Sequence, residues 1–215
     1  MTKLLIATRN DHKVAEIRAI LGVDFQCFTL RDFPGAPEVV EDAKTFAGNA
    51  GKKAQEIARW LKLQPGALPD YILADDSGLE VDVLGGAPGV YSARFAAQDS
   101  GRVGNSSDGE NNAKLLQLLA DQPRENRTAR FRCVMVLVST APQVSNDMMT
   151  WQGEGVCEGW IDFGARGGGG FGYDPLFIPS GFEVSFAQLG ETTKNQISHR
   201  AHALEKLKAH FATMA

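Results

Sequence analysis

Cysteine is scarce in this sequence, and long apolar runs are missing. The 215 residues include three cysteines, an odd number without a C-x-x-C pair: Cys27, Cys133 and Cys157. Neither a disulfide framework nor a zinc site fits this spacing, so we expect a reducing compartment. The first residues, MTKLLIATRN, hold only four consecutive apolar side chains, too few for a signal peptide or a membrane span. We therefore expect a cytoplasmic protein without a membrane partner.

A surplus of basic residues is also missing. Lysine and arginine number 22 against 26 aspartates and glutamates, which gives a net charge of -4. Proteins that bind nucleic acids in general carry a basic face, so we expect no nucleic-acid partner, although a small anion can still bind in a local basic pocket. A hydrophobic content of 43% is enough for a real core. The length slightly favours one domain over two.

The spacing of apolar residues predicts a mixed α/β sheet with helices on its flanks. Apolar runs predict strands at Lys3–Thr8, Tyr71–Ala74 and Phe131–Val138, with Thr150–Ile161 as an antiparallel partner of the third. Helical spacing predicts four helices, at 11–21, 46–61 and 111–119 and over the last residues from Ala201. Strands and helices alternate early and strands pair late, which is typical of a mixed sheet with a hairpin-rich lobe.

Two adjacent aspartates follow the second predicted strand, in the stretch LADDSGLEVDVLGGAPGVYSARF, residues 73–95. Ligands of open α/β sheets gather beyond the carboxyl ends of strands. Neighbouring residues of a strand point to opposite faces, so Asp75 and Asp76 need not do the same job. One of them could hold Mg²⁺, which proteins bind through one or two carboxylates together with substrate phosphates. The alternative is a turn with capping aspartates, since Ser-Gly and a glycine-rich loop follow directly.

Two basic segments could hold the anion that such a site requires. The loop TRNDHK, Thr8–Lys13, joins a predicted strand to a helix N-terminus, where backbone N–H groups favour anions. The alternative is an ordinary capped helix with a solvated lysine. In the second predicted helix, Asn49 and Lys53 fall beside the apolar stripe at roughly 100° per residue. A lysine at such a border often only extends along apolar surface to reach water.

Two later segments carry side chains that suit a nucleobase. In GGGGFGYDPLF, residues 167–177, glycines let Phe171, Tyr173 and Asp174 approach a ligand. Aromatic rings stack on bases and a carboxylate can accept from a base N–H, although a flexible loop tip is the alternative. His199 and Arg200 place cations in the first turn of the last predicted helix, against the helix dipole. A local rule broken in this way indicates function, and surface charge without consequence is the alternative.

Taken in order, these segments resemble the signature blocks of the inosine triphosphate pyrophosphatase family. The matching blocks run from Lys3 to about Leu207: TRNDHKVAEI, F-x-x-NA-x-x-KA, ADDSGLEVDVLGGAPGVYSARFA, GGFGYDPLF and SHRAHAL. The resemblance implies an elongated α/β fold with two lobes around a central active-site cleft, in a single domain over residues 1–215, and a homodimer. It also implies Mg²⁺-dependent hydrolysis of deaminated purine triphosphates (ITP, dITP, XTP) to the monophosphate and pyrophosphate, which prevents their incorporation into DNA and RNA.

Carried over by position, the resemblance assigns roles to individual residues. It implies that Asp76 accepts a proton from the attacking water and, together with Glu41, binds one Mg²⁺ per subunit. The triphosphate would contact residues of the first loop and the second helix: Thr8, Arg9, Asn10, Asp11, His12, Lys13 and Lys53. The nucleoside and its base would contact a second set: Ser77, Phe171, Gly172, Tyr173, Asp174, Lys194, His199 and Arg200.

Two positions depart from the pattern of that family. Arg9 stands where members often have glycine or serine, which adds charge at the phosphates. Gly48 stands where many bacterial members have the glutamate of F-x-ENA, which leaves Glu41 as the second metal ligand, with Glu38 and Asp42 as alternatives. Two competing interpretations are a Maf-like pyrophosphatase acting on other modified nucleotides and a regulator that binds nucleotides without hydrolysing them.

Overall fold

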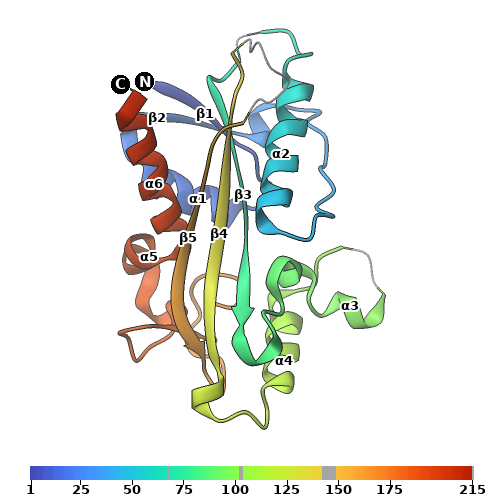
Figure 1. The fold of residues 1–215 in the computed structure, drawn as a ribbon, viewed down its shortest axis with the longest axis vertical. Helices are drawn as coiled ribbons and strands as arrows, with labels where there is room; N and C mark the ends of the chain where they lie inside the picture. Colours follow the sequence, from blue (N-terminus) through green and yellow to red (C-terminus); the bar gives the residue numbers. More distant parts are fainter. Residues whose placement is uncertain (67, 102–103, 142–148, 215) are drawn as a thin grey trace. The chain divides into compact units, whose positions relative to one another are not determined.

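The computed structural model describes residues 1–66, 68–101, 104–141 and 149–214 (Figure 1). The chain forms two compact units: unit 1 comprises Met1–Asp76, Cys133–Gly155 and Arg200–Ala215, and unit 2 comprises Ser77–Arg132 and Val156–His199. The strands are β1 (Thr2–Ile6), β2 (Phe25–Thr29), β3 (Tyr71–Val81), β4 (Thr128–Ser139), β5 (Met149–Ile161) and β6 (Phe177–Pro179). The helices are α1 (Asp11–Leu21), α2 (Phe46–Leu61), α3 (Ala97–Ser100), α4 (Asp108–Leu118), α5 (Phe186–Ile197) and α6 (His199–Met214).

The strands form one mixed sheet in the order β2-β1-β3-β4-β5-β6. β1 pairs in parallel with β2 and with β3, so that Leu4 lies opposite Cys27 on one side and Tyr71 on the other. β5 and β6 pair antiparallel. β3, β4 and β5 each begin in one unit and end in the other. The predicted mixed α/β sheet with flanking helices is confirmed.

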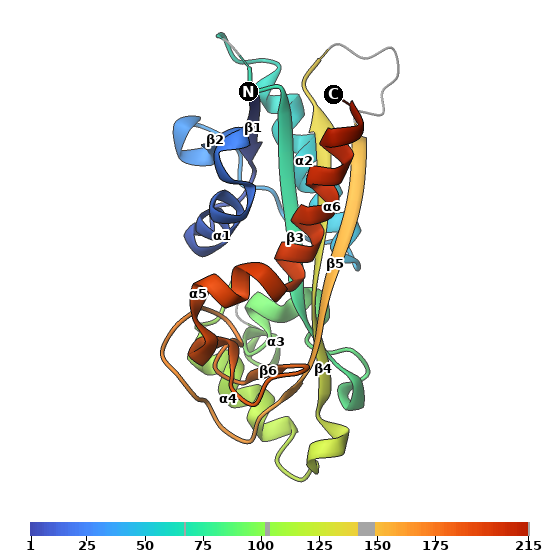
Figure 2. The ribbon, with the colours of Figure 1, turned by 90° about the vertical axis from the view of Figure 1, so that its left-hand side faces the viewer.

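Both faces of the strands are buried in unit 1. Leu5 of β1 and Ile72 of β3 pack against Ile57 of α2 on one face. The next residues along the two strands, Ile6 and Leu73, pack on the other face with α1 and α6. Figures 1 and 2 show α2 on one side of these strands and α1 and α6 on the other. This alternation follows from the period of two in a strand, and it lets neighbouring residues of β3 serve different helices.

Unit 2 has a separate core that is rich in aromatic side chains. The rings of Phe131 and Phe177 meet edge to face at a centroid distance of 4.8 Å, and Phe177 and Phe186 lie 5.2 Å apart. Leu79 of β3 and Leu115 of α4 pack in the same cluster. Paired rings of this kind stabilise a core beyond the area that they bury. They therefore hold β6 and α5, which carry Phe177 and Phe186, in the core of unit 2.

One predicted strand boundary is wrong. β3 does not end at the aspartates but continues from Tyr71 to Val81. Asp75 and Asp76 are therefore interior strand residues with relative exposures of 1% and 7%. The backbone can stay extended there because each carboxylate finds its own partners on its own face. A predicted helix also begins earlier, at Asp108, because Ser107 caps it in reciprocal hydrogen bonds with Glu110.

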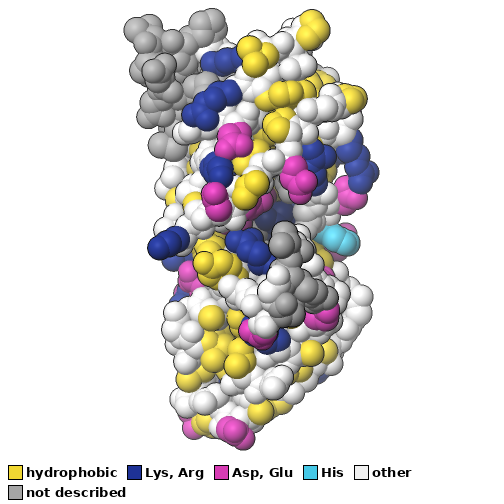
Figure 3. Space-filling model, turned by 90° about the vertical axis from the view of Figure 1, so that its right-hand side faces the viewer, with side chains coloured by type: hydrophobic (Ala, Val, Ile, Leu, Met, Phe, Trp, Pro, Cys, Tyr) yellow, Lys and Arg dark blue, Asp and Glu magenta, His cyan; other side chains and the backbone are white. Residues whose placement is uncertain are grey.

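The outer surface of unit 1 carries charges of both signs. In Figure 3, which views the molecule from the side of α2, lysine and arginine side chains are interspersed with aspartate and glutamate. One such pair joins Nζ of Lys52 to Oδ1 of Asp42 at 2.7 Å. Across the described part of the chain, no helix combines the length and the apolar character that crossing a bilayer requires.

Candidate active site

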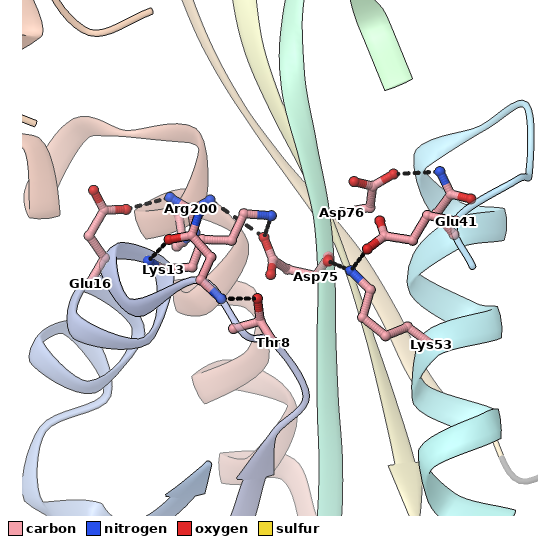
Figure 4. A network of polar contacts seen from close by, with 10 residues as sticks. Thr8, Lys13, Glu16, Glu41, Lys53, Asp75, Asp76 and Arg200 are labelled. Atoms are coloured by element: carbon pink, nitrogen blue, oxygen red, sulfur yellow. Dashed lines mark hydrogen bonds and ion pairs between the residues drawn. The ribbon is translucent and has the colours of Figure 1, made fainter. Parts of the chain in front are cut away.

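A buried charge centre in unit 1 surrounds Asp75 in β3 (Figure 4). Nζ of Lys13 lies 2.9 Å from Oδ2 of Asp75, and a guanidinium nitrogen of Arg200 lies 3.4 Å from the same oxygen. Arg200 also pairs with Glu16 of α1. The side chains of Asp75 and Arg200 are only 0% and 1% exposed. Charges that have left water to this extent depend on one another for their stability.

The charges of this centre hold Asp75 in its ionised form. Burial by itself raises the pKa of the Asp75 carboxyl, but Lys13, Arg200 and Lys53 outweigh burial and hold the pKa well below its usual range. For Arg200, burial lowers the pKa, and the nearby Asp75 and Glu16 carboxylates more than reverse that effect. The centre is therefore a fixed cluster of ions at neutral pH, and Asp75 is unsuited to exchange protons there.

Asp76 lies on the other face of β3, toward α2 (Figure 4). Nδ2 of Asn49 donates to Oδ2 of Asp76 across 2.9 Å. Nζ of Lys53 donates to the backbone carbonyl of Asp75 across 2.9 Å and lies 2.8 Å from Oε1 of Glu41. The expectation that the two aspartates face opposite sides is confirmed. Each thereby acquires a different chemical environment.

The environment of Asp76 favours a carboxylate that can take up a proton. Burial raises the pKa of Asp76, and Glu41 adds to that effect. Lys13, Lys53 and the hydrogen bond from Asn49 act in the opposite direction, and the pKa nevertheless lies above its ordinary value. A carboxylate whose charge is partly disfavoured by burial is a stronger base than a solvated one, as a proton acceptor for water needs to be.

The loop between β1 and α1 caps the N-terminus of α1 beside this centre. Oδ1 of Asn10 caps α1 by accepting from the N–H of Lys13 across 3.1 Å, and Oγ1 of Thr8 accepts from the N–H of Asn10 across 3.2 Å. The Lys13 side chain then points to Asp75. Thr8, Asn10 and Lys13 thus lie together, as the sequence predicts, at a helix N-terminus of the kind that favours anions.

The other predicted residues of this loop lie elsewhere. Arg9 donates to the backbone carbonyl of Ala36 across 2.7 Å, and Asp11 forms an exposed ion pair with Arg31. Both Arg9 and Asp11 line a cavity of about 470 Å³, together with residues that include Arg18 and Arg31. At roughly 100° per residue this cavity meets the face of α1 opposite the Lys13 side chain. His12 is exposed.

A second polar cluster lies in unit 2, around Asp174. Nζ of Lys194 pairs with Oδ2 of Asp174, and these two side chains are 4% and 2% exposed. The same ammonium lies 4.5 Å from the centroid of the Phe171 ring, whose backbone N–H donates to Asp174 across 2.9 Å. Gly170 has a φ of 74°, and a Cβ there would lie 2.1 Å from Oδ2 of Asp174. Only glycine permits this close turn.

Gly172 and Tyr173 are held by other parts of unit 2. Oδ2 of Asp108, at the start of α4, accepts from the N–H of Gly172 across 2.6 Å. The hydroxyl of Tyr173 donates to the backbone carbonyl of Ser92 across 2.9 Å. Burial raises the pKa of the Tyr173 phenol, so the hydroxyl stays protonated and remains a donor. The aromatic segment is therefore fixed in place at both residues.

His199 and Ser77 complete the predicted residues of unit 2. The imidazole of His199 stacks on the ring of Phe131 at a centroid distance of 4.8 Å and an interplanar angle of 13°. Ser77 follows Asp76 in β3 and is half-buried. Of the two residues that open α6, His199 thus belongs to unit 2 and Arg200 to unit 1.

Glu41 and Asp76 are the carboxylates of unit 1 that the sequence predicts as ligands of a metal ion. Within the described residues, no three or more His, Cys, Asp or Glu side chains are grouped to hold a metal ion. A set of two carboxylates falls short of the three or four protein ligands of a zinc site. It does suit Mg²⁺, which takes one or two carboxylates and completes its shell with water and substrate phosphates.

The ion pair between Glu16 and Arg200 was not predicted from the sequence. Glu16 lies three positions after Lys13 in α1, and residues with this spacing share one helix face. That spacing was a usable signal. The hydrogen bond between Asn49 and Asp76 was not predicted either, although helical spacing places Asn49 beside the apolar stripe of α2.

The chain is similar over nearly its whole length to proteins named dITP/XTP pyrophosphatase. It is 48% identical over 211 residues to the protein of Geobacter sulfurreducens, which covers 98% of this chain and 96% of that relative. It is 46% identical over 205 residues to the protein of Desulforamulus reducens, which covers 95% of this chain and 92% of that relative.

Solved structures show the same fold. The Ham1 protein of Staphylococcus aureus matches with a TM-score of 0.80 and 32% identity over 100% of both chains. A HAM1 protein of Coxiella burnetii matches with a TM-score of 0.81 and 33% identity, over 99% of this chain and 100% of that one. The sequence model of the Ham1 family matches residues 4–210. The family resemblance of the sequence blocks is thereby confirmed, and the chain belongs to the Ham1 family.

Proposed function

We propose that the protein hydrolyses deaminated purine nucleoside triphosphates, among them ITP, dITP and XTP, to the monophosphate and pyrophosphate. The observation that carries this proposal is the full-length similarity to proteins named dITP/XTP pyrophosphatase. The residues of unit 1 also support it. Lys13, Lys53 and the N-terminus of α1 suit a polyphosphate, and the carboxylates of Glu41 and Asp76 suit a divalent cation. The cellular role of the protein is to remove such nucleotides before they enter DNA or RNA.

The residues of unit 1 bind and activate the triphosphate end. Lys13, Lys53 and the positive N-terminal end of α1 neutralise the phosphate charge, which grows on the leaving pyrophosphate as the bond breaks. Asp76 accepts the proton of the attacking water. Asp75 does not take part in proton transfer, since its neighbours keep it ionised. It holds Lys13 in position, and Arg200 and Glu16 support it.

Glu41 and Asp76 hold one Mg²⁺ per subunit in this proposal. The bound ion supplies charge neutralisation at the phosphates and makes a bound water more acidic. Lys53 pairs with Glu41, and Asn49 donates to Asp76. These contacts orient both carboxylates.

The residues of unit 2 recognise the nucleoside. The ring of Phe171 offers a stacking face, and Asp174 and Lys194 offer an acceptor and a donor fixed by their mutual ion pair. Contacts of the nucleoside with Gly172, Tyr173, Ser77 and His199 stay predictions. A base contact by Arg200 stays a prediction, because its guanidinium is 1% exposed and bound to two carboxylates. Asp11, His12 and Arg9 likewise stay predicted phosphate contacts. The homodimer and the cytoplasmic location also stay predictions.

Incubation of the purified protein with ITP and Mg²⁺ tests this function. We expect IMP and pyrophosphate as products, separated by ion-exchange chromatography. IDP and orthophosphate would show that the attack occurs at the terminal phosphate and would contradict the proposal. A panel of ITP, dITP, XTP and the four standard triphosphates, with a modified pyrimidine triphosphate added, distinguishes a purine-specific enzyme from a pyrophosphatase with other substrates. Binding of ITP without turnover would indicate a nucleotide-binding regulator.

A further inference from the structure

Gly48 occupies a position in the first turn of α2 where a side chain does not fit. A Cβ at residue 48 would lie 2.8 Å from Cβ of Ala43 and 3.0 Å from Oγ1 of Thr45. Contacts shorter than 3.0 Å require one of the atoms to move. Glycine is a poor residue for a helix, so the local preference of α2 does not explain its presence. The steric contact with Ala43 does.

The neighbours of Gly48 are held firmly. Thr45 caps α2 by accepting from the N–H of Gly48 across 3.0 Å. The N–H of Ala43 donates to Oδ1 of Asn49 across 2.9 Å, and Asn49 is 0% exposed with its other amide atom bound to Asp76. The Cβ of Ala43 is attached directly to this anchored backbone. Rotation of a side chain therefore cannot relieve the contact, and the segment before α2 would have to shift.

The segment that would shift carries Glu41, two residues before Ala43. Oε1 of Glu41 lies 2.8 Å from Nζ of Lys53, which also donates to the backbone carbonyl of Asp75. Movement at Ala43 thus acts on Glu41 directly and on Asp76 through Asn49. These are the two carboxylates that hold the metal ion in the proposed function.

We propose that Gly48 is a positioning residue: the absence of its side chain lets Ala43 close against α2 and fixes Glu41 and Asp76 for metal binding. The metal-binding part of this inference rests on the proposed function, whereas the steric part does not. The departure from the family pattern at Gly48 then has its counterpart at Ala43, since residues 43 and 48 cannot both carry a Cβ in this arrangement.

A double-mutant cycle tests the steric part by thermal unfolding. Gly51, one turn further along α2, is the matched control because a Cβ there meets nothing within 4 Å. Gly51→Ala should raise the Tm by about 2–4 °C, as helix preference dictates. Gly48→Ala should lower the Tm instead. In the Ala43→Gly background, Gly48→Ala should lower the Tm less, because only the contact of 3.0 Å with Oγ1 of Thr45 remains. A rise of the Tm for Gly48→Ala alone, or an equal loss in the Ala43→Gly background, overturns the proposal.

The dependence on Mg²⁺ tests the positioning part. Gly48→Ala should raise the Mg²⁺ concentration for half-maximal ITP hydrolysis about tenfold or more, the size expected when the support of a metal ligand is lost. The Mg²⁺-dependent increase of the Tm should shrink in the same variant. The Gly51→Ala variant and the Ala43→Gly/Gly48→Ala double variant should both behave like the original protein.

A lower Tm with unchanged Mg²⁺ dependence in Gly48→Ala would make the contact merely structural and would overturn the positioning role. If the original protein does not hydrolyse ITP, the proposed function fails while the cycle in Tm still decides the steric part.

Discussion

At the scale of single residues, Asp75 and Asp76 show how adjacent identical side chains acquire different properties. Asp75 faces Lys13 and Arg200 and has a lowered pKa, whereas Asp76 faces Asn49 and has a raised pKa. Strand alternation alone separates them. The two substitutions by asparagine should therefore have different effects on stability and on activity.

Asp76→Asn should reduce kcat for ITP by at least about 100-fold, the contribution expected of a proton acceptor. Its Tm should change little, because burial already disfavours the charge of Asp76 and a neutral amide of the same shape replaces it. Asp75→Asn should instead lower the free energy of unfolding by about 3–5 kcal/mol, since it leaves two buried cations with a lost partner. Thermal melts and initial rates of both variants measure this. Equal loss of stability in the two variants would contradict the assignment.

At the scale of elements, Arg127 connects the end of α4 to the end of β5. Its guanidinium donates to three backbone carbonyls, those of Leu119 at 2.6 Å, Asp162 at 2.9 Å and Gln122 at 3.0 Å. The residue is 2% exposed although it is charged. Carbonyls past the end of a helix lack partners within the helix. Arg127 supplies a donor to each of these three, and the carbonyl of Leu119 also accepts from the N–H of Gln122 across 3.0 Å.

Arg127→Met should lower the free energy of unfolding by at least about 2 kcal/mol, because the carbonyls of Gln122 and Asp162 lose this donor and each buried carbonyl without a donor costs about 1–3 kcal/mol. Arg130→Met is the matched control. Arg130 makes partly exposed ion pairs with Asp82 and Glu158, which are each worth about 1 kcal/mol or less. Urea unfolding of both variants gives the comparison. A loss at Arg127 no larger than that at Arg130 would show that water replaces the guanidinium.

Local patterns predicted some elements and failed for others. The bounds of α1 and α2 could be predicted because their apolar stripes and their caps, Asn10 and Thr45, are contiguous in sequence. α5 escaped prediction because Gly190, with a φ of 79°, interrupts its helical period. The full length of β3 and the burial of Arg200 depend on partners far away in the chain. No local pattern contains that information.

At the scale of the whole molecule, two cores share three strands. Unit 1 buries aliphatic side chains on both faces of its strands, and unit 2 has its own aromatic cluster. β3, β4 and β5 pass through both units. If the chain is a single domain with two lobes, as predicted, the two units should unfold in one transition.

Loss of core packing in one unit should lower the unfolding midpoint reported by the other. Trp60 and Trp151 belong to unit 1 and Trp160 to unit 2, so replacing the first two by phenylalanine leaves a probe of unit 2. Ile57→Ala in the core of unit 1 should then shift the Trp160 fluorescence midpoint as far as the circular dichroism midpoint. Its expected cost is about 2–5 kcal/mol. A Trp160 transition that stays in place would show two independently folding domains.

The ion pair between Arg200 and Asp75 spans 125 positions of the chain, and this has a consequence for synthesis on the ribosome. At about 5–20 residues per second, roughly 6–25 s separate the translation of Asp75 from that of Arg200. Throughout that interval Asp75 can pair with Lys13 but not with Arg200, which has not yet been translated. Every residue of unit 2 is translated before Arg200. Translation therefore begins in unit 1 but completes unit 2 first. The charge centre can be assembled only when α6 emerges.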